Sequence, residues 1–173
     1  AHPPIVDRVI HKKVNKKENK LALCSAIAAT ASKELVESRG HKVEKIKSFP
    51  IIVSDEIESI SNAKELAKLF DALNLTQDIG RLKARKARTG KSALRGRRKK
   101  IGRSVLFITK SSKELSKACG SFPGVEVKEV KDLSVLDLAP GSDPIRLVVY
   151  SKAALDEIAK IKSPHLELMV KIK

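Results

Sequence analysis

Two short stretches have residue types and spacing that could support chemistry. Thr89-Gly90-Lys91-Ser92 contains the Gly-Lys-Ser of a phosphate-binding loop, in which backbone amides and a lysine hold phosphate groups. That motif also requires a glycine where Arg85 stands, and a strand before it, whereas basic residues flank this stretch. Ser54-Asp55-Glu56 follows an apolar run, where α/β enzymes place catalytic carboxylates, but these residue types also cap helices. We therefore expect no nucleotide binding, and we expect residues 54–56 to cap a helix.

The residues that most often bind metal ions are scattered along the chain. Cys24 and Cys119 are far apart and lack a Cys-x-x-Cys spacing, so we expect small core residues rather than a disulfide or a zinc site. No Ser/His/Asp, Cys/His or Gly-x-Ser-x-Gly arrangement is evident either. We therefore expect a protein that is not an enzyme, with no catalytic residue, no metal and no cofactor. The four histidines share no metal-ligand spacing: His2, His11, His41 and His165.

A basic tract is the strongest functional signal in the sequence. Residues 81–103 hold 12 Lys or Arg in 23 positions and no acidic residue. Arginine pairs with phosphate through two hydrogen bonds and lysine acts as a point charge, while interspersed glycines let the backbone turn tightly. The tract has no aromatic side chain on which a base could stack. It therefore favours contact with the phosphates and groove shape of structured RNA over two alternatives, DNA binding and a nuclear-localisation signal.

The distribution of charge separates this tract from an otherwise ordinary domain. The chain has 173 residues and a formal net charge of +16. Residues 81–103 contribute +12 and residues 1–20 contribute +4, so the remainder is neutral overall. A hydrophobic fraction of 42% excludes a fully disordered protein, and an aromatic fraction of 3% predicts an aliphatic core. The longest apolar run is too short to span a membrane. Two segments that bind polyanions on a neutral core are the expected organisation.

Helical periodicity recurs in several segments between the expected strands. Residues 18–39 predict one long helix that ends at Gly40, with an apolar stripe of Leu21, Ile27, Ala28, Ala31, Leu35 and Val36. Residues 61–73 predict a second helix, and Ser111-x-x-Glu114 is a capping-box match before a third over about 112–119. One helical turn is expected at 134–138, and a further helix at about 151–161.

Four runs of β-branched and apolar residues predict strands. Residues 104–109 and 146–150 are the clearest, and residues 49–54 fit a strand buried on both faces. Residues 125–130 alternate between apolar and charged side chains, which predicts a strand near an edge with one solvated face. Strands that alternate with helices indicate an α/β sandwich with a mostly parallel sheet.

The sequence resembles a known family along nearly its whole length. It is similar to the fourth protein of the large ribosomal subunit in its archaeal form. The resemblance implies a Rossmann-like α/β domain bound to large-subunit ribosomal RNA, with a long extension that reaches the peptide exit tunnel. The stretches that carry it, in order, are AHPP at 1–4, LALCSAIAATA at 21–31, RGH at 39–41, PIIVSDEIE at 50–58, RTGKSALRGRR at 88–98, SVLFIT at 104–109, FPGVEV at 122–127, LAPG at 138–141 and RLVVYSKAAL at 146–155.

The resemblance and the residues together predict the organisation of the chain. Residues 1–20 form a basic N-terminal arm, which resembles the returning end of the family's extension, so we expect the family's first strand, a helix and most of that extension to be absent. Residues 21–162 form the α/β domain, which carries the basic loop 81–103. Residues 163–173 form a C-terminal tail.

The expected function is that of a structural, RNA-binding constituent of the large ribosomal subunit in the cytoplasm. Its expected partners are large-subunit ribosomal RNA and neighbouring ribosomal proteins, with no membrane and no small-molecule substrate. The alternatives are a translational regulator that binds its own messenger RNA and an enzyme on the same α/β core. The residues expected to bind RNA are Arg8, Lys12, Lys13, Lys16, Lys17, Arg81, Lys83, Arg85, Lys86, Arg88, Gly90, Lys91, Arg95, Gly96, Arg97, Arg98, Lys99, Lys100 and Arg103.

Overall fold

The computed structural model of the chain describes residues 3, 5–10, 12–46, 48–99, 102–143 and 145–161. The expected tail at 163–173 lies outside these residues. The elements are α1 (Lys16–Ala29), α2 (Lys33–Ser38), β1 (Ile51–Val53), the 3-10 helix η1 (Asp55–Ser59), α3 (Ala63–Ala72), α4 (Thr76–Lys83), α5 (Lys91–Leu94), β2 (Leu106–Thr109), α6 (Lys113–Cys119), β3 (Glu126–Glu129), η2 (Val130–Asp132), α7 (Val135–Leu138), η3 (Pro140–Ser142), β4 (Val148–Ser151) and α8 (Lys152–Ile158).

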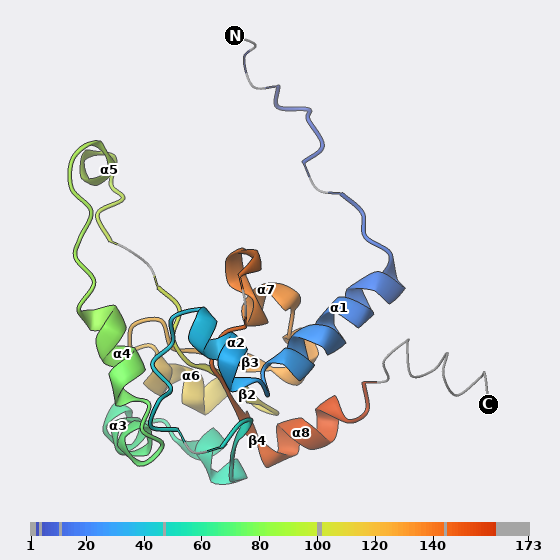
Figure 1. Cartoon of the computed structure of the whole chain (residues 1–173), viewed down its shortest axis with the longest axis vertical. Coiled ribbons are helices and arrows are strands. Elements are labelled where there is room, and N and C mark those ends of the chain that lie inside the picture. Colours follow the sequence, from blue (N-terminus) through green and yellow to red (C-terminus); the bar gives the residue numbers. More distant parts are fainter. Residues whose placement is uncertain are drawn as a thin grey trace.

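The four strands form one parallel sheet in the order β1-β4-β2-β3 (Figure 1). All residues of β2 and β4 are buried, as their uninterrupted apolar runs predict for central strands. The expected edge strand at 125–130 is confirmed by β3, which is paired on one side only. The expectation that residues 49–54 are buried on both faces is wrong. β1 is the other edge strand, with one neighbour, and Ile52 on it is 48% exposed.

Helices cover both faces of this sheet. The Phe107 ring of β2 packs against Phe70 of α3, with ring centroids 5.9 Å apart. The next residue, Ile108, faces the opposite side because side chains alternate along a strand, and its register partner is Tyr150. The Tyr150 hydroxyl lies 2.8 Å from Thr30 Oγ1 at the end of α1. α3 and α1 therefore lie on opposite faces, and the predicted α/β sandwich is confirmed (Figure 1).

The predicted helix over 18–39 is two helices. α1 ends at Ala29, where Thr30 Oγ1 donates a hydrogen bond of 2.6 Å to the Ile27 carbonyl, and α2 begins at Lys33. Leu21 in α1 and Leu35 in α2, both expected on the apolar stripe, are exposed, whereas Val36 of the same stripe is fully buried.

Side chains at the carboxyl ends of the strands cap helices that are distant in sequence. Asp55 accepts a hydrogen bond of 2.7 Å from the Ala153 amide at the start of α8, so its expected capping role is fulfilled on another helix. The predicted capping box at Ser111 is wrong, because α6 starts after Ser112. Glu129 Oε1 accepts hydrogen bonds from the amide and the hydroxyl of Ser112. None of the described helices is long and apolar enough to cross a membrane.

Candidate nucleic-acid interface

The basic tract forms a protrusion from the globular part of the molecule. Residues 84–99, named here the basic protrusion, follow α4 and carry the short helix α5 at their tip (Figure 1). Backbone hydrogen bonds from the Arg88 amide to the Arg98 carbonyl (2.9 Å) and from the Arg97 amide to the Ser92 carbonyl (2.9 Å) join its two sides. Gly90 and Gly96 bracket α5 with φ values of +64° and +75°, which other residues rarely adopt. The tip therefore keeps a defined turn although Leu94 within it is 87% exposed.

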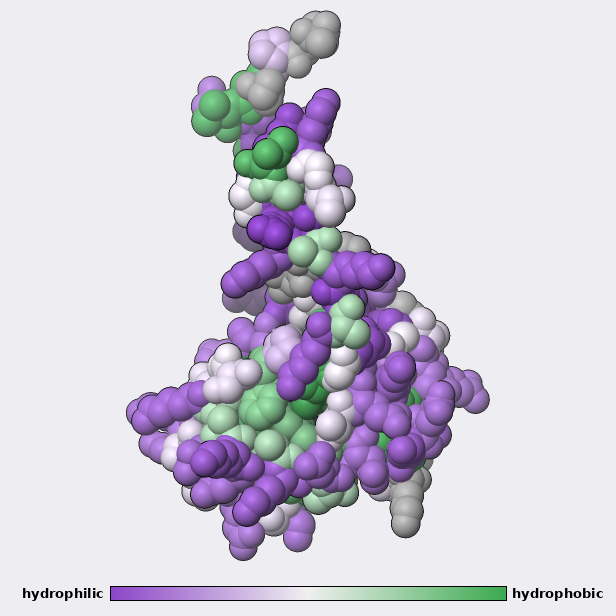
Figure 2. All heavy atoms as spheres, turned by 90° about the vertical axis from the view of Figure 1, so that its left-hand side faces the viewer, coloured by the Kyte–Doolittle hydropathy of each residue, from purple (hydrophilic) through white to green (hydrophobic). Residues whose placement is uncertain are grey.

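Hydrophilic side chains gather along this protrusion above the globular part (Figure 2). Its described cations are all exposed, and no ion pair joins Arg97 or Arg98 to an acidic group within the described part of the chain. The exposed cations of the protrusion are Arg85, Lys86, Arg88, Lys91, Arg95, Arg97, Arg98 and Lys99. Lys100 lies outside the described residues, and Arg103, also exposed, follows at the base.

The cations of the N-terminal arm lie in a separate segment. Arg8, Lys12 and Lys13 are exposed and precede the first helix, in a segment where the described residues form neither helix nor strand. Lys16 and Lys17 are exposed in the first turn of α1. In Figure 1 this segment and the basic protrusion leave the globular part on the same side. Two basic segments therefore flank one side of the core.

The start of the basic tract belongs to the core rather than to a loop. Residues 81–83 complete α4, and Leu82 is buried with 7% exposure. The expectation that the whole stretch 81–103 is a loop is therefore wrong at residues 81–83, and also at the short helix α5. Helical periodicity continues through Ile79 and Leu82 despite the surrounding charge, which explains why the helix extends into the tract.

A buried carboxylate anchors this end of the tract. The Asp78 side chain is fully buried and accepts hydrogen bonds from Arg81 Nε (2.9 Å) and Ser104 Oγ (2.5 Å). His41 Nδ1 lies 3.1 Å from Asp78 Oδ2, while His41 Nε2 accepts from the Leu147 amide (3.4 Å). Burial by itself would raise the pKa of Asp78, but the hydrogen bonds from His41, Arg81 and Ser104 outweigh it and hold the pKa far below its ordinary value. The carboxylate is therefore ionised and fixes Arg81 at the base.

A buried arginine anchors the returning end. Arg146, just before β4, donates to the carbonyls of Ser104 (2.6 Å), Val105 (3.1 Å) and Gly124 (2.7 Å), and to Glu126 Oε2 (2.6 Å). Burial lowers the pKa of Arg146 to about 9, which leaves the group charged at neutral pH. A buried charge is tolerated when it is paired and fully hydrogen-bonded, as here. Arg146 therefore holds together the backbone from which β2 and β3 start.

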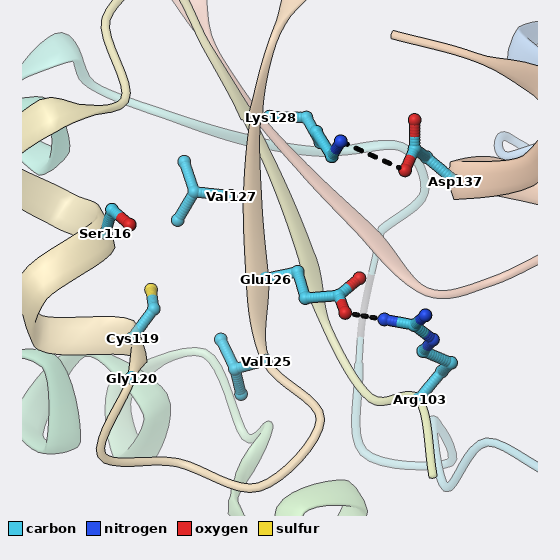
Figure 3. A pocket seen from close by; sticks show the side chains of 9 residues that line it. All are labelled: Arg103, Ser116, Cys119, Gly120, Val125, Glu126, Val127, Lys128 and Asp137. Atoms are coloured by element: carbon cyan, nitrogen blue, oxygen red, sulfur yellow. Dashed lines mark ion pairs between the residues drawn. The ribbon is translucent and has the colours of Figure 1, made fainter. Parts of the chain in front are cut away.

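The second carboxylate oxygen of Glu126 binds a cation of the tract itself. Figure 3 shows Arg103 pointing toward Glu126 on β3, with which it forms an ion pair. Glu126 thereby joins Arg103, which is exposed, to Arg146, which is buried. On the same strand Lys128 points toward Asp137, 3.5 Å away (Figure 3). β3 is thus tied by charge to the base of the protrusion and to α7.

Two glycines allow the chain to close at this base. A Cβ on Gly102 would lie 2.5 Å from Leu82 Cδ2 and 2.6 Å from a guanidinium nitrogen of Arg85. A Cβ on Gly124 would lie 2.5 Å from the Gly102 carbonyl oxygen, and its φ is +73°. The Ser104 amide donates to the Gly124 carbonyl (2.8 Å) at the same point. The close approach of the backbone at residues 102–104 to Gly124, against the side chains of Leu82 and Arg85, therefore sets where the protrusion begins.

The Gly-Lys-Ser stretch has a different setting from that of a phosphate-binding loop. Gly90 and Lys91 lie at the exposed tip, before a helix of four residues, and no strand leads into them. Across the described ranges no group of three or more His, Cys, Asp or Glu could hold a metal ion. Cys119 is buried, as expected, and Cys24 is half-buried.

Sequence reasoning missed the residues that build the base. In the sequence, Arg146 is only the first residue of an apolar run, and Asp78 is one acidic residue before the basic tract. A single arginine at the start of a continuous apolar run was the available signal, because a charge there needs buried partners. His41 is isolated in the sequence, and no sequence signal links it to residue 78.

Comparisons with known proteins place this chain in a family. The profile described as "Ribosomal protein L4/L1 family" matches residues 1–161. Three archaeal relatives carry the name "Large ribosomal subunit protein uL4": the chain is 44% identical to that of Methanococcus aeolicus over 161 residues, 41% to that of Methanosphaera stadtmanae over 162, and 46% to that of Pyrobaculum aerophilum over 160.

The matches cover most of this chain but a smaller share of each relative. They cover 92%, 93% and 91% of this chain, but 64%, 62% and 56% of the respective relatives, so the chain spans about three fifths of their length. The resemblance seen in the sequence is confirmed, including its archaeal type. The family is one of structural ribosomal proteins and not of enzymes, which confirms the prediction of a non-enzyme. The chain belongs to the ribosomal protein L4/L1 family.

Proposed function

We propose that this chain is a structural constituent of the large ribosomal subunit that binds ribosomal RNA through its basic protrusion and N-terminal arm. The observation that carries the proposal is the protrusion itself, an exposed run of cations on a neutral α/β core. The names of the relatives support the ribosomal setting. In that setting the chain acts in the cytoplasm, within the ribosome.

The cations divide into contacts of the protrusion and contacts of the arm. Exposed guanidinium groups on a narrow protrusion can reach phosphates on either side of an RNA groove. Positive φ at Gly90 and Gly96 lets the tip turn without side chains between backbone and phosphate. We propose as RNA contacts Arg8, Lys12, Lys13, Lys16, Lys17, Arg81, Lys83, Arg85, Lys86, Arg88, Lys91, Arg95, Arg97, Arg98, Lys99, Lys100 and Arg103, with Gly90 and Gly96 as residues that shape the tip.

The proposal includes partners beyond the RNA contacts. The arm at residues 1–20 resembles the returning end of an extension, and we propose that it supports the region of the exit tunnel. Neighbouring large-subunit proteins are proposed partners of the surfaces that RNA leaves uncovered. Both proposals concern the assembled subunit, so reconstitution with ribosomal RNA is the setting in which they are tested.

The salt dependence of RNA affinity tests the proposal. The full chain is titrated with large-subunit ribosomal RNA over a range of salt concentrations. If about six to eight cations contact phosphates, the log–log slope should be roughly −4 to −6, because each contact contributes about −0.7. Replacing Arg97 and Arg98 with Ala should reduce the slope by about one to two. The matched control replaces Lys64 and Lys68, two exposed cations of α3, and should leave the slope unchanged.

The outcomes separate the proposal from its alternative. Equal affinity for ribosomal RNA and for unrelated RNA of the same length would contradict a specific ribosomal role. Tighter binding to the chain's own messenger RNA would favour the translational regulator instead. An unchanged slope in the Arg97 and Arg98 variant would show that the protrusion is not the RNA-binding surface.

A further inference from the structure

A pocket at the base of the basic protrusion gathers arginines from three separate parts of the chain. Arg39 follows α2, Arg81 lies in α4, and Arg85 and Arg103 lie on the two sides of the base. The pocket has a volume of about 270 Å³, large enough for one phosphate group with water. Of the described residues that line it, Asp143 is the acidic one. Arg39 lies outside both basic tracts, so no sequence pattern groups it with them.

Hydrogen bonds hold two of these guanidinium groups in place. Arg39 donates to the Pro140 carbonyl (2.7 Å) and to the Asp143 carbonyl (3.2 Å). Arg81 donates to the Asp78 carboxylate (2.9 Å) and to the Arg103 carbonyl (3.2 Å). A site with fixed donors binds an anion better than mobile side chains do, because less conformational entropy is lost on binding.

The charges around the pocket leave an excess of two positive charges. Five arginines belong to the pocket or share its ion pairs, namely the four that line it and Arg146, which binds Glu126 together with Arg103. Among the residues that the structure describes, three carboxylates face them: Asp78, Glu126 and Asp143. Burial and the neighbouring charge of Arg81 lower the pKa of Arg39, and Asp143 opposes this shift. An anion in the pocket would relieve the repulsion among these cations.

We propose that the pocket formed by Arg39, Arg81, Arg85 and Arg103 binds one phosphate group of an RNA backbone. This inference rests on the RNA binding proposed above and assigns Arg39 to it. The guanidinium fork matches two phosphate oxygens, and four such groups around one cavity suit an oxyanion better than a planar base. The site would fix the position of the RNA at the rigid base, whereas the protrusion contacts it further out.

The test compares variants of the full chain in binding to large-subunit ribosomal RNA. Arg39→Ala should weaken binding about tenfold, the effect of losing one charge-assisted contact, and reduce the salt slope by about 0.7 to 0.9. Lys64→Ala, which removes an exposed cation of α3 outside the pocket, should change neither quantity. Arg39→Lys keeps the charge but not the fork, so its loss should be intermediate.

A variant that is expected to tighten RNA binding distinguishes an effect on binding from damage to the fold. Arg39→Ala also removes bonds to the Pro140 and Asp143 carbonyls, so its thermal unfolding is measured alongside. Asp143→Asn removes the acidic charge of the pocket and should tighten RNA binding about twofold. Damage to the fold cannot produce tighter binding. Asp143→Asn with unchanged or weaker RNA affinity would count against the site.

A titration with inorganic phosphate identifies the source of the anion. NMR signals of the arginine Nε–H groups are followed as inorganic phosphate or RNA is added. Shifts at Arg39 with RNA alone would assign the site to a backbone phosphate, and shifts with both would show a general phosphate site. If Arg39→Ala retains the affinity and the slope while the Arg97 and Arg98 variant loses them, this inference is wrong and the proposed function stands. If the unaltered chain does not bind the RNA, both are wrong.

Discussion

Replacing Asp78 with Asn should destabilise the fold strongly. The Asp78 carboxylate accepts hydrogen bonds from Arg81 Nε (2.9 Å), Ser104 Oγ (2.5 Å) and the Lys42 amide (3.2 Å), and lies 3.1 Å from His41 Nδ1. An amide nitrogen in its place would face donors and leave Arg81 without an ionised partner. Breaking a buried pair costs about 3–5 kcal/mol. Because the Arg81 side chain is 21% exposed and can be partly solvated, we expect about 3 kcal/mol, the lower end.

The same carboxylate should make the free energy of unfolding depend on pH. Burial would raise the pKa of Asp78, but its hydrogen bonds from His41, Arg81 and Ser104 lower it far below the ordinary value. A carboxyl group with a depressed folded pKa contributes its full stability above its unfolded pKa of about 3.9, and loses it as pH falls through the folded pKa. The stability difference between the unaltered chain and Asp78→Asn should therefore be constant near neutral pH and shrink below about pH 4.

Urea unfolding at a series of pH values measures this difference. Asp71→Asn is the matched control, because Asp71 is exposed and accepts a hydrogen bond of 2.6 Å from Thr76 Oγ1. Asp71→Asn should lower the free energy of unfolding by no more than about 1 kcal/mol. If Asp78→Asn were as stable as the unaltered chain at neutral pH, or if the difference did not change with pH, the assignment of Asp78 as the anchor of the base would be wrong.

Three further outcomes follow from packing and accessibility. Leu106→Ala in the buried centre of β2 should cost roughly 2–5 kcal/mol in urea unfolding while the salt slope of RNA binding stays unchanged. Gly124→Ala should lower the melting temperature measurably, since its Cβ would meet the Gly102 carbonyl oxygen at a positive φ; an unchanged melting temperature would contradict that contact. Burial raises the pKa of Cys119 to about 12, so a thiol reagent near neutral pH should label Cys24 well before Cys119; equal rates by mass spectrometry would contradict this.

The fold could be predicted largely because local patterns and tertiary structure agree. Continuous apolar runs identified β2 and β4 as buried strands, and alternation identified β3 as an edge strand. Periodicity failed at residues 30–32, where Thr30 is fixed by a contact with Tyr150 that lies far away in sequence. It also failed to reveal that residues 49–54 form an edge strand, because strand order depends on how the helices cross over the sheet.

The basic tract could be located from charge alone. Charge does not show which of its cations are fixed at the base and which are exposed on the protrusion. Composition treats Arg81 and Arg97 alike, whereas the structure places one against a buried carboxylate and the other on the exposed protrusion. The partners that make this difference, Asp78 and Glu126, precede and follow the tract and carry no motif. Ion pairs between distant residues depend on the packed geometry, so no local pattern in this sequence could predict them.

The position of the tract on the sheet explains how an α/β fold serves a role without catalysis. Parallel α/β enzymes bind ligands at the carboxyl ends of their strands, where polar side chains are left available. Here Asp55 caps α8, Glu58 accepts hydrogen bonds from the amides of residues 110 and 111, and Glu129 holds the start of α6. The cations instead meet at the amino ends, where Arg81 and Arg103 are fixed by carboxylates next to β2 and β3. The side chains at the carboxyl ends of the strands, where enzymes of this fold bind their ligands, therefore stabilise the core. Under the proposed function, the amino ends of the strands present the protrusion to RNA.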